Sequence, residues 1–189
     1  MTFELQFPIE EVAAYASRFA FEQEAEALAI GAAARKRGYY ARDEFIRICL
    51  WKTRRVSRRI QNNSGEEIEI ATRAALGGEG IKPLLGLDGV SWGRASTLLH
   101  LALPDVYPIL DHRAVHALGE RWPSAVTFTF WSDFAEAFRG RARTCRSVRP
   151  RARPRAVAVV ERAGAAGPLL SAVDGGRDYD CPEPPVPPP

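Results

Sequence analysis

Asp111 is the residue of this sequence whose type and position are best suited to chemistry. It follows an apolar run, Val106 to Leu110, near the point where a helix is expected to open, with Asp111 in its first turn. The helix dipole stabilises a carboxylate at the start of a helix. Such a carboxylate can act as a general base or stabilise a developing positive charge. Taken alone, the same residue is also typical of a helix start with no chemical role.

A tight turn that leads into a helix is the second feature with chemical potential. Asp88 and Gly89 form a turn signal, because glycine adopts a positive φ without the steric cost of a Cβ. Ser91 then offers a hydroxyl cap to the next helix. Backbone N–H groups at a helix start point outward and suit a phosphate, and Arg94 adds a cation. The predicted contact residues are Gly89, Val90, Ser91, Trp92, Gly93 and Arg94.

Basic side chains upstream form another candidate phosphate surface. The run from Arg35 to Arg59 contains KTRRVSRR and is interleaved with Tyr39, Tyr40 and Trp51. This pattern is typical of a nucleic-acid backbone contact, although a solvated charged face has the same composition. The predicted contacts here are Lys52, Arg54 and Arg55, with Arg113 beside Asp111 as a further one.

Helices must position these residues, because no strand pattern competes anywhere in the chain. Ser64 followed by Glu67 is a capping box that opens one of them. The fold class is therefore all-α, with about seven or eight helices. The expected helices outside the turn region span Ile9 to about Arg37, Arg42 to about Lys52, a short piece before Arg59, Ser64 to about Leu76, and Thr127 to Arg139.

The turn and the aspartate together resemble a known family, the helix-hairpin-helix DNA glycosylase superfamily. Leu87, Gly89, Val90 and Ala95 match its hairpin, and the segment PDVYPILDHR looks like the segment that carries its catalytic aspartate. The spacing from Ala95 to that aspartate also matches. An upstream Trp-Lys pair, here residues 51–52, is similar to a smaller branch of the superfamily.

The resemblance implies a helix-hairpin-helix domain over residues 1–140 and a role in DNA repair on double-stranded DNA. It makes Asp111 the catalytic residue of a monofunctional glycosylase, which hydrolyses the N-glycosidic bond of a flipped base. Ser91 stands where a second hairpin glycine is usual, and Gly93 where bifunctional members carry a Schiff-base lysine. The second departure argues against lyase activity through that lysine.

No cofactor and no metal are expected. The cysteines are Cys49, Cys145 and Cys181, which do not form a four-cysteine iron–sulfur pattern. His112 and His116 lie one helical turn apart, but no third ligand motif accompanies them, so the spacing is interpreted as a coincidence on a helix face.

The composition predicts a single soluble domain in a reducing compartment. The chain has 189 residues, enough to bury a core, and an odd number of widely spaced cysteines. The acidic start MTFELQFPIEE does not look like a secretory signal, and no apolar run is long enough for a membrane span. We expect a cytoplasmic monomer. The net charge of +3 comes mostly from arginines after Gly140, so it is weak support for DNA binding by the folded part.

The composition changes after Gly140. Residues 141–189 are rich in arginine and proline, lose helical periodicity, and are expected to be disordered. One hypothesis is that this tail is a frame-shifted translation of GC-rich DNA. Two alternatives to the glycosylase stay open: a non-catalytic helix-hairpin-helix module that only binds DNA, and a protein-interaction module that uses the tail.

Overall fold

The structure is a computed structural model that describes residues 3–11, 24–54 and 57–148. These residues form eight α-helices and no strand, which confirms the all-α prediction for the described part of the chain. Among them, no helix has the length and apolar character needed to cross a membrane. The helices are α2 (Ala25–Arg37), α3 (Arg42–Lys52), α4 (Ser57–Asn62), α5 (Gly65–Ala74), α6 (Lys82–Leu85), α7 (Trp92–Ala102), α8 (His112–Ala117) and α9 (Phe128–Val148).

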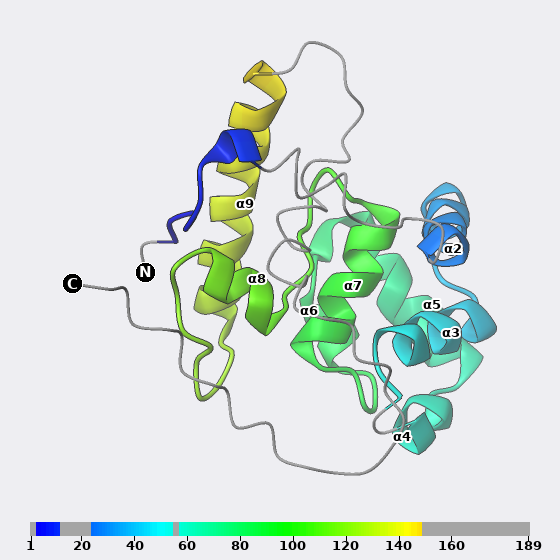
Figure 1. The fold of residues 1–189 in the computed structure, drawn as a ribbon. Helices are drawn as coiled ribbons and strands as arrows, with labels where there is room; N and C mark the ends of the chain where they lie inside the picture. Colours follow the sequence, from blue (N-terminus) through cyan, green and yellow to red (C-terminus); the bar gives the residue numbers. More distant parts are fainter. Residues whose placement is uncertain (1–2, 12–23, 55–56, 149–189) are drawn as a thin grey trace.

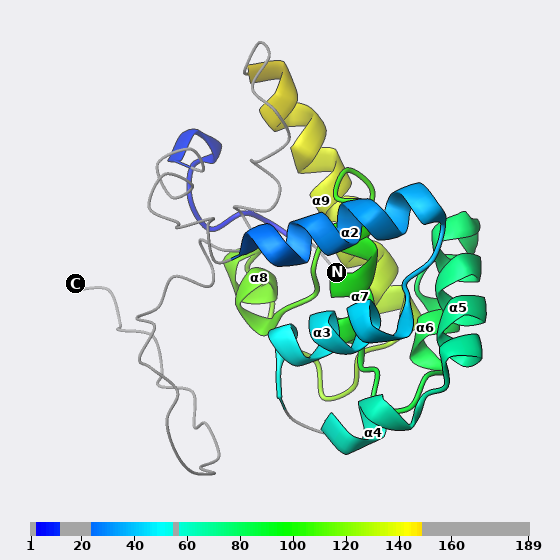
Figure 2. The same cartoon turned by 90° about the vertical axis from the view of Figure 1, so that its right-hand side faces the viewer.

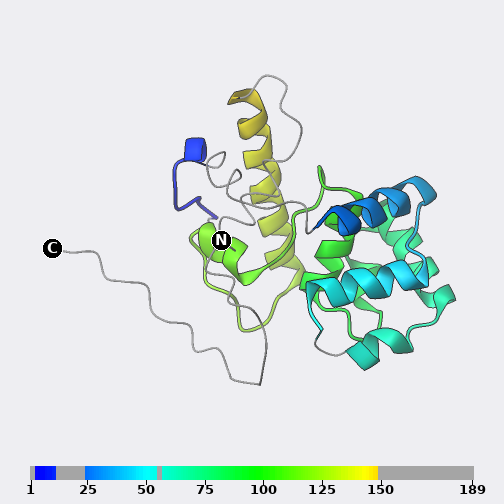
Figure 3. The same ribbon diagram turned by 45° about the vertical axis from the view of Figure 1, so that its right-hand side comes forward.

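Helix α7 lies at the centre of the molecule. Figure 1 shows it between α9 on one side and α2 on the other, and Figure 3 separates α8 and α9 from the group α2 to α5. Every residue from Arg94 to Ala102 is buried, as expected for a helix that is covered on all sides. Leu98 and Leu99 are fully buried and belong to the hydrophobic core.

Helix α2 crosses α7 at very short range because α2 carries a glycine at the crossing. A Cβ on Gly31 would lie 2.2 Å from the carbonyl oxygen of Leu101. Gly31 lies within a regular helix, so no unusual backbone conformation requires glycine there. Glycine is required because a Cβ would collide with the backbone of α7. Figure 2 shows α2 lying across this face of the molecule, above α3.

Local signals predicted several helix boundaries correctly. Helix α3 spans the predicted residues, and the Ser64–Glu67 capping box is present with both of its hydrogen bonds, 3.2 Å to Ser64 Oγ and 2.7 Å to Glu67 Oε2. After α5 the chain continues as a π-helical turn, η3 (Ala75–Glu79), in which Gly78 has a φ of 124°. A residue with a Cβ rarely adopts that φ, so the predicted glycine break is confirmed.

The predicted helix from Ile9 to Arg37 is only partly described. Its ends form a 3-10 turn, η1 (Ile9–Glu11), and helix α2. The segment before η1 runs beside α8, because the N–H groups of Glu4 and Gln6 donate to the carbonyls of Leu118 and Ala117, at 2.8 and 3.0 Å.

The last helix continues further than expected. Helix α9 runs to Val148, so the loss of helical structure predicted directly after Gly140 is wrong for residues 141–148. Proline is absent from this part of the tail, and nothing there removes a backbone donor. Apolar side chains at helical spacing bury the first half of α9, among them Phe130, Phe134 and Phe138. The rest of the predicted disordered tail, residues 149–189, lies outside the described residues, as does the frame-shift hypothesis for it.

The α2–α7 crossing generates a stability prediction. Gly31→Ala should lower the free energy of unfolding by about 1–3 kcal/mol, because the added methyl group forces the two backbones apart. Gly65→Ala is the matched control, since a Cβ at this first residue of α5 meets nothing within 4 Å. Urea denaturation of both variants measures the difference. Equal midpoints for the two would contradict the close crossing.

Candidate functional site

Asp111 caps helix α8. It is the N-cap residue, in an extended conformation, and its Oδ1 accepts a hydrogen bond of 3.0 Å from the backbone N–H of Arg113. The helix therefore begins at His112, directly after Asp111, and the expected place of Asp111 inside the first turn is corrected to the cap position. Its carboxylate is partly buried, with 28% of the side chain exposed.

Lys52, the last residue of α3, faces the second oxygen of this carboxylate. Its Nζ lies 3.3 Å from Asp111 Oδ2, and its side chain is 24% exposed. Figure 2 shows the end of α3 beside the start of α8. The sequence predicted Lys52 as a phosphate contact. In the structure it is the ion-pair partner of the candidate catalytic residue, and the two are far apart in sequence.

The surroundings of Asp111 favour its ionised form. Burial acts to raise the pKa of this carboxyl, but the charge of Lys52, the N–H of Arg113 and the neighbouring His112 together outweigh it and lower the pKa below its ordinary value. At neutral pH the group is a carboxylate held by two donors. Such a group can stabilise a positive charge or accept a proton from water.

Helix α7 holds the segment that ends in Asp111. Ser96 Oγ accepts a 2.8 Å hydrogen bond from the N–H of Leu110, and it donates to the carbonyl of Gly93 at 3.0 Å. A Cβ on Gly93 would lie only 3.3 Å from the carbonyl oxygen of Leu110, so the two backbones are nearly in contact. Gly93 and Ser96 thus set where Asp111 begins α8.

The turn before α7 has the predicted backbone conformation. Gly89 has a φ of 73°, and a Cβ there would also lie 3.0 Å from Arg59 Cβ. Ser91 occupies the N-cap position of α7, but its side chain makes no cap hydrogen bond, so the predicted hydroxyl cap is wrong. Ser91 is exposed at the helix start.

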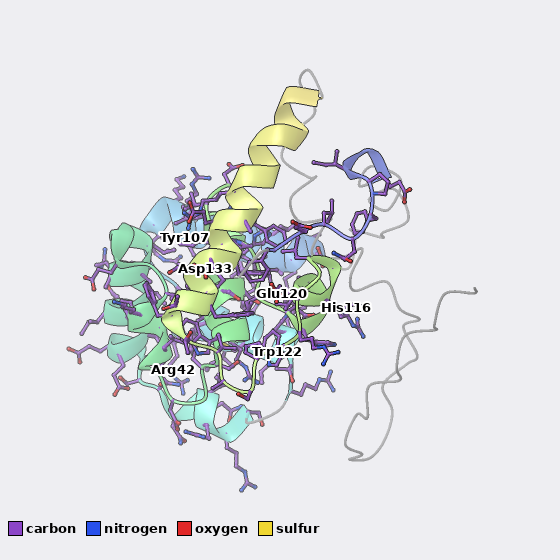
Figure 4. The ribbon with its side chains drawn as sticks, turned by 90° about the vertical axis from the view of Figure 1, so that its left-hand side faces the viewer. Arg42, Tyr107, His116, Glu120, Trp122 and Asp133 are labelled. Carbon is purple, nitrogen blue, oxygen red and sulfur yellow. The ribbon has the colours of Figure 1, made fainter. Side chains whose placement is uncertain are left out.

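A buried asparagine that sequence reasoning missed fixes this turn. Asn63 is 5% exposed, its Nδ2 donates to the carbonyls of Asp88 and Ile60 at 2.9 Å each, and its Oδ1 accepts from the N–H of Asp88 at 2.7 Å. Arg42, labelled in Figure 4, donates to the carbonyl of Asn63 at 3.1 Å. The Asn63 signal in the sequence is weak, because an asparagine before Ser64 reads equally well as a loop residue.

The predicted DNA contacts divide into exposed and buried residues. Arg54, Ser91 and Arg113 are exposed, and Arg55 lies outside the described residues. Val90 is 9% exposed and packs in the core, and Trp92 is partly buried against that core. Arg94 is only 5% exposed, which corrects its expected role as an outward cation beside the turn.

The three interleaved aromatic residues differ in exposure: Trp51 is exposed, Tyr39 is partly buried and Tyr40 is buried. Trp51 is 41% exposed, whereas Tyr40 is 1% exposed and donates its hydroxyl to the carbonyl of Leu98 at 2.7 Å. Tyr40 is therefore a core residue. The ring of Tyr39 is in contact with the guanidinium groups of Arg37 and Arg73, at 4.8 and 4.6 Å.

The histidines of α8 do not form a metal site with their neighbours. His116 lies at the outer side of α8, as Figure 4 shows, and both His112 and His116 are exposed. In the described part of the chain no three metal-binding side chains gather at one point.

A shallow depression of about 610 Å³ lies beside the turn. Its lining residues are Thr53, Arg59, Leu85, Leu87, Gly89, Val90, Ser91 and Arg94. Asp111 is not one of them, so this depression adjoins the turn and not the carboxylate.

The chain matches no protein-family model, no curated protein and no solved structure.

The ion pair generates a prediction about charge. In Lys52→Met the pKa of Asp111 should rise, because the lowering charge is lost while burial remains. Carbon-13 NMR titration of the aspartate carboxyls measures it. Lys36→Met, an exposed lysine on α2, is the control and should leave that pKa unchanged.

The same shift has a consequence for acid stability. A carboxyl whose pKa is lower in the folded chain stabilises the fold above its unfolded pKa, and this stabilisation is lost as pH falls through the folded value. Lys52→Met should therefore lose less stability on acidification than the wild type. An unchanged Asp111 titration in Lys52→Met would contradict the pair.

Proposed function

We propose that the protein binds double-stranded DNA at the turn before α7 and hydrolyses the N-glycosidic bond of a flipped base with Asp111. The observation that carries this proposal is the ionised, partly buried Asp111 carboxylate held beside the first turn of α7. The resemblance of this part of the sequence to the helix-hairpin-helix superfamily also supports the proposal, together with the order tight turn, helix, link and aspartate-capped helix.

The chemistry suits a fixed carboxylate. Cleavage of an N-glycosidic bond builds positive charge on the sugar, and an anion below the ring stabilises that charge. The carboxylate can also orient or deprotonate the attacking water. Asp111 keeps its orientation through the Arg113 N–H bond at Oδ1 even when the Lys52 contact at Oδ2 is exchanged for substrate.

The turn supports a phosphate contact through its backbone. Ser91 is exposed at the start of an eleven-residue helix, where N–H groups and the helix dipole favour an anion. Arg54, Arg59 and Arg113 are exposed cations on neighbouring elements, and such cations supply the non-specific, salt-dependent part of DNA binding.

A second candidate is a DNA-binding module without catalysis. One observation favours it: both oxygens of Asp111 already have partners, one in capping α8 and one in the ion pair, and the depression beside the turn does not include Asp111. Under this reading Asp111 is a structural residue and DNA binding depends on the turn alone.

Asp111→Asn separates the two candidates. Asparagine is as good an N-cap as aspartate, so the fold and DNA affinity should be kept, while loss of the charge should slow base release by about 10²–10⁴-fold. Oligonucleotide duplexes with uracil, alkylated or oxidised bases, cleaved by alkali after incubation, measure this release. Asp43→Asn on α3 is the control. Equal activity of wild type and Asp111→Asn would remove Asp111 from the mechanism, and no activity in either would leave the second candidate.

A charge placed at the turn tests DNA binding. Ser91→Asp should keep the helix, because aspartate is a favoured N-cap, but should weaken duplex binding by repelling a phosphate. Thr129→Asp puts the same charge in the exposed first turn of α9 and should bind as the wild type. Fluorescence anisotropy at several salt concentrations measures affinity. Equal loss in both variants would show that overall charge, and not the turn, decides binding.

A further inference from the structure

Arg94 joins two segments that are remote in sequence. Its Nη1 donates to the carbonyl of Gly89, in the turn, and its Nη2 donates to the carbonyl of Thr53, directly after Lys52, at 3.2 Å each. The side chain is buried, and its neighbours include the buried thiol of Cys49. A buried guanidinium that binds two carbonyls through two separate nitrogens is a rigid link.

The same helical turn also holds the other side of the site. Gly93 and Ser96 contact Leu110, the residue before Asp111. Residues 93–96 of α7 therefore hold the backbone next to Lys52 through Arg94, and the backbone next to Asp111 through Gly93 and Ser96. Neither end of the Lys52–Asp111 pair is placed by its own helix alone.

We propose that Arg94 is a positioning residue, which holds the end of α3 against the turn and thereby sets the Lys52–Asp111 contact, and that it does not bind phosphate. This deepens the proposed function, since it rests on Asp111 being the reacting group. The proposal gives Arg94 a structural role in place of the DNA contact that the sequence predicted for it. The titratable side chains of Lys52 from α3 and His112 from α8 face Asp111.

Arg94→Lys is the decisive variant, because it keeps the charge and loses the planar fork. One ammonium nitrogen replaces two separate donors, so the Thr53 and Gly89 carbonyls are no longer held at a defined separation. The pKa of Asp111 in the full-length chain should rise toward its value in Lys52→Met. In Lys52→Met/Arg94→Lys it should rise no further than in Lys52→Met, because Arg94 acts through Lys52.

A DNA-binding measurement tests the alternative role of Arg94, which is a contact with phosphate. The slope of log affinity against log salt for a short duplex should be equal for wild type and Arg94→Lys, and equal again for Arg94→Gln. A residue that contacts phosphate would lose about 0.9 from this slope when its charge is removed. Arg94→Gln also serves as the second variant if a buried lysine prevents folding, since its amide is neutral. Circular dichroism and the unfolding midpoint verify that each variant is folded.

The outcomes distinguish this proposal from the proposed function. An unchanged Asp111 pKa in both folded Arg94 variants, or an equal rise with and without Lys52, would overturn the positioning role. A reduced salt slope in Arg94→Gln would assign Arg94 to phosphate instead. Absence of salt-dependent duplex binding by the wild type would remove the DNA proposal, while the titration would still decide whether Arg94 sets the pair.

Discussion

Burial of polar groups along α7 is the constraint on which the rest of the structure depends. Four of the buried residues of this helix are polar: Arg94, Ser96, Thr97 and His100. A polar group removed from water costs free energy unless it is hydrogen-bonded, so each one needs a partner. Thr97 Oγ1 bonds the carbonyl of Gly93 within the helix, at 2.7 Å. The other three reach segments outside it, and the helix thereby determines where those segments lie.

These outward bonds place the non-helical parts of the molecule. His100 Nδ1 lies 2.7 Å from the carbonyl oxygen of Tyr107, and Ser96 bonds the N–H of Leu110, so the link between α7 and α8 is held at two points. Figure 4 labels Tyr107 in this link. Pro104 and Pro108 remove two backbone donors from this link, and His100 and Ser96 of α7 bond two of its remaining backbone groups. The start of α8 is defined by α7 in this way.

The Lys52–Asp111 pair illustrates how one arrangement serves structure and chemistry together. A partly exposed ion pair contributes little to stability by itself, because water and salt screen it. Its larger effect is on the charge of Asp111, which stays ionised although burial opposes ionisation. The same two contacts would keep a reacting carboxylate oriented, and they would equally stabilise the end of a short helix.

Sequence patterns predicted the features that depend on neighbours in the chain. The capping box at Ser64, the bounds of α3 and the positive φ of Gly89 follow from short-range sterics and hydrogen bonding, which act within a few residues. The position of Asp111 at a helix start also depends on short-range interactions and was predicted in the same way. The wrong hydroxyl cap at Ser91 shows the limit, because the side chain has the right chemistry but does not make the bond.

The sequence by itself therefore determined an all-α fold, the tight turn before α7 and a carboxylate at the next helix start. The tertiary structure decided that Arg94 points inward, that Asn63 holds the turn, and that Lys52 faces Asp111. These contacts join residues far apart in the chain. They depend on how α3, α4 and α8 pack around α7. The local sequence does not decide whether a guanidinium or ammonium group faces water or an acceptor within the fold.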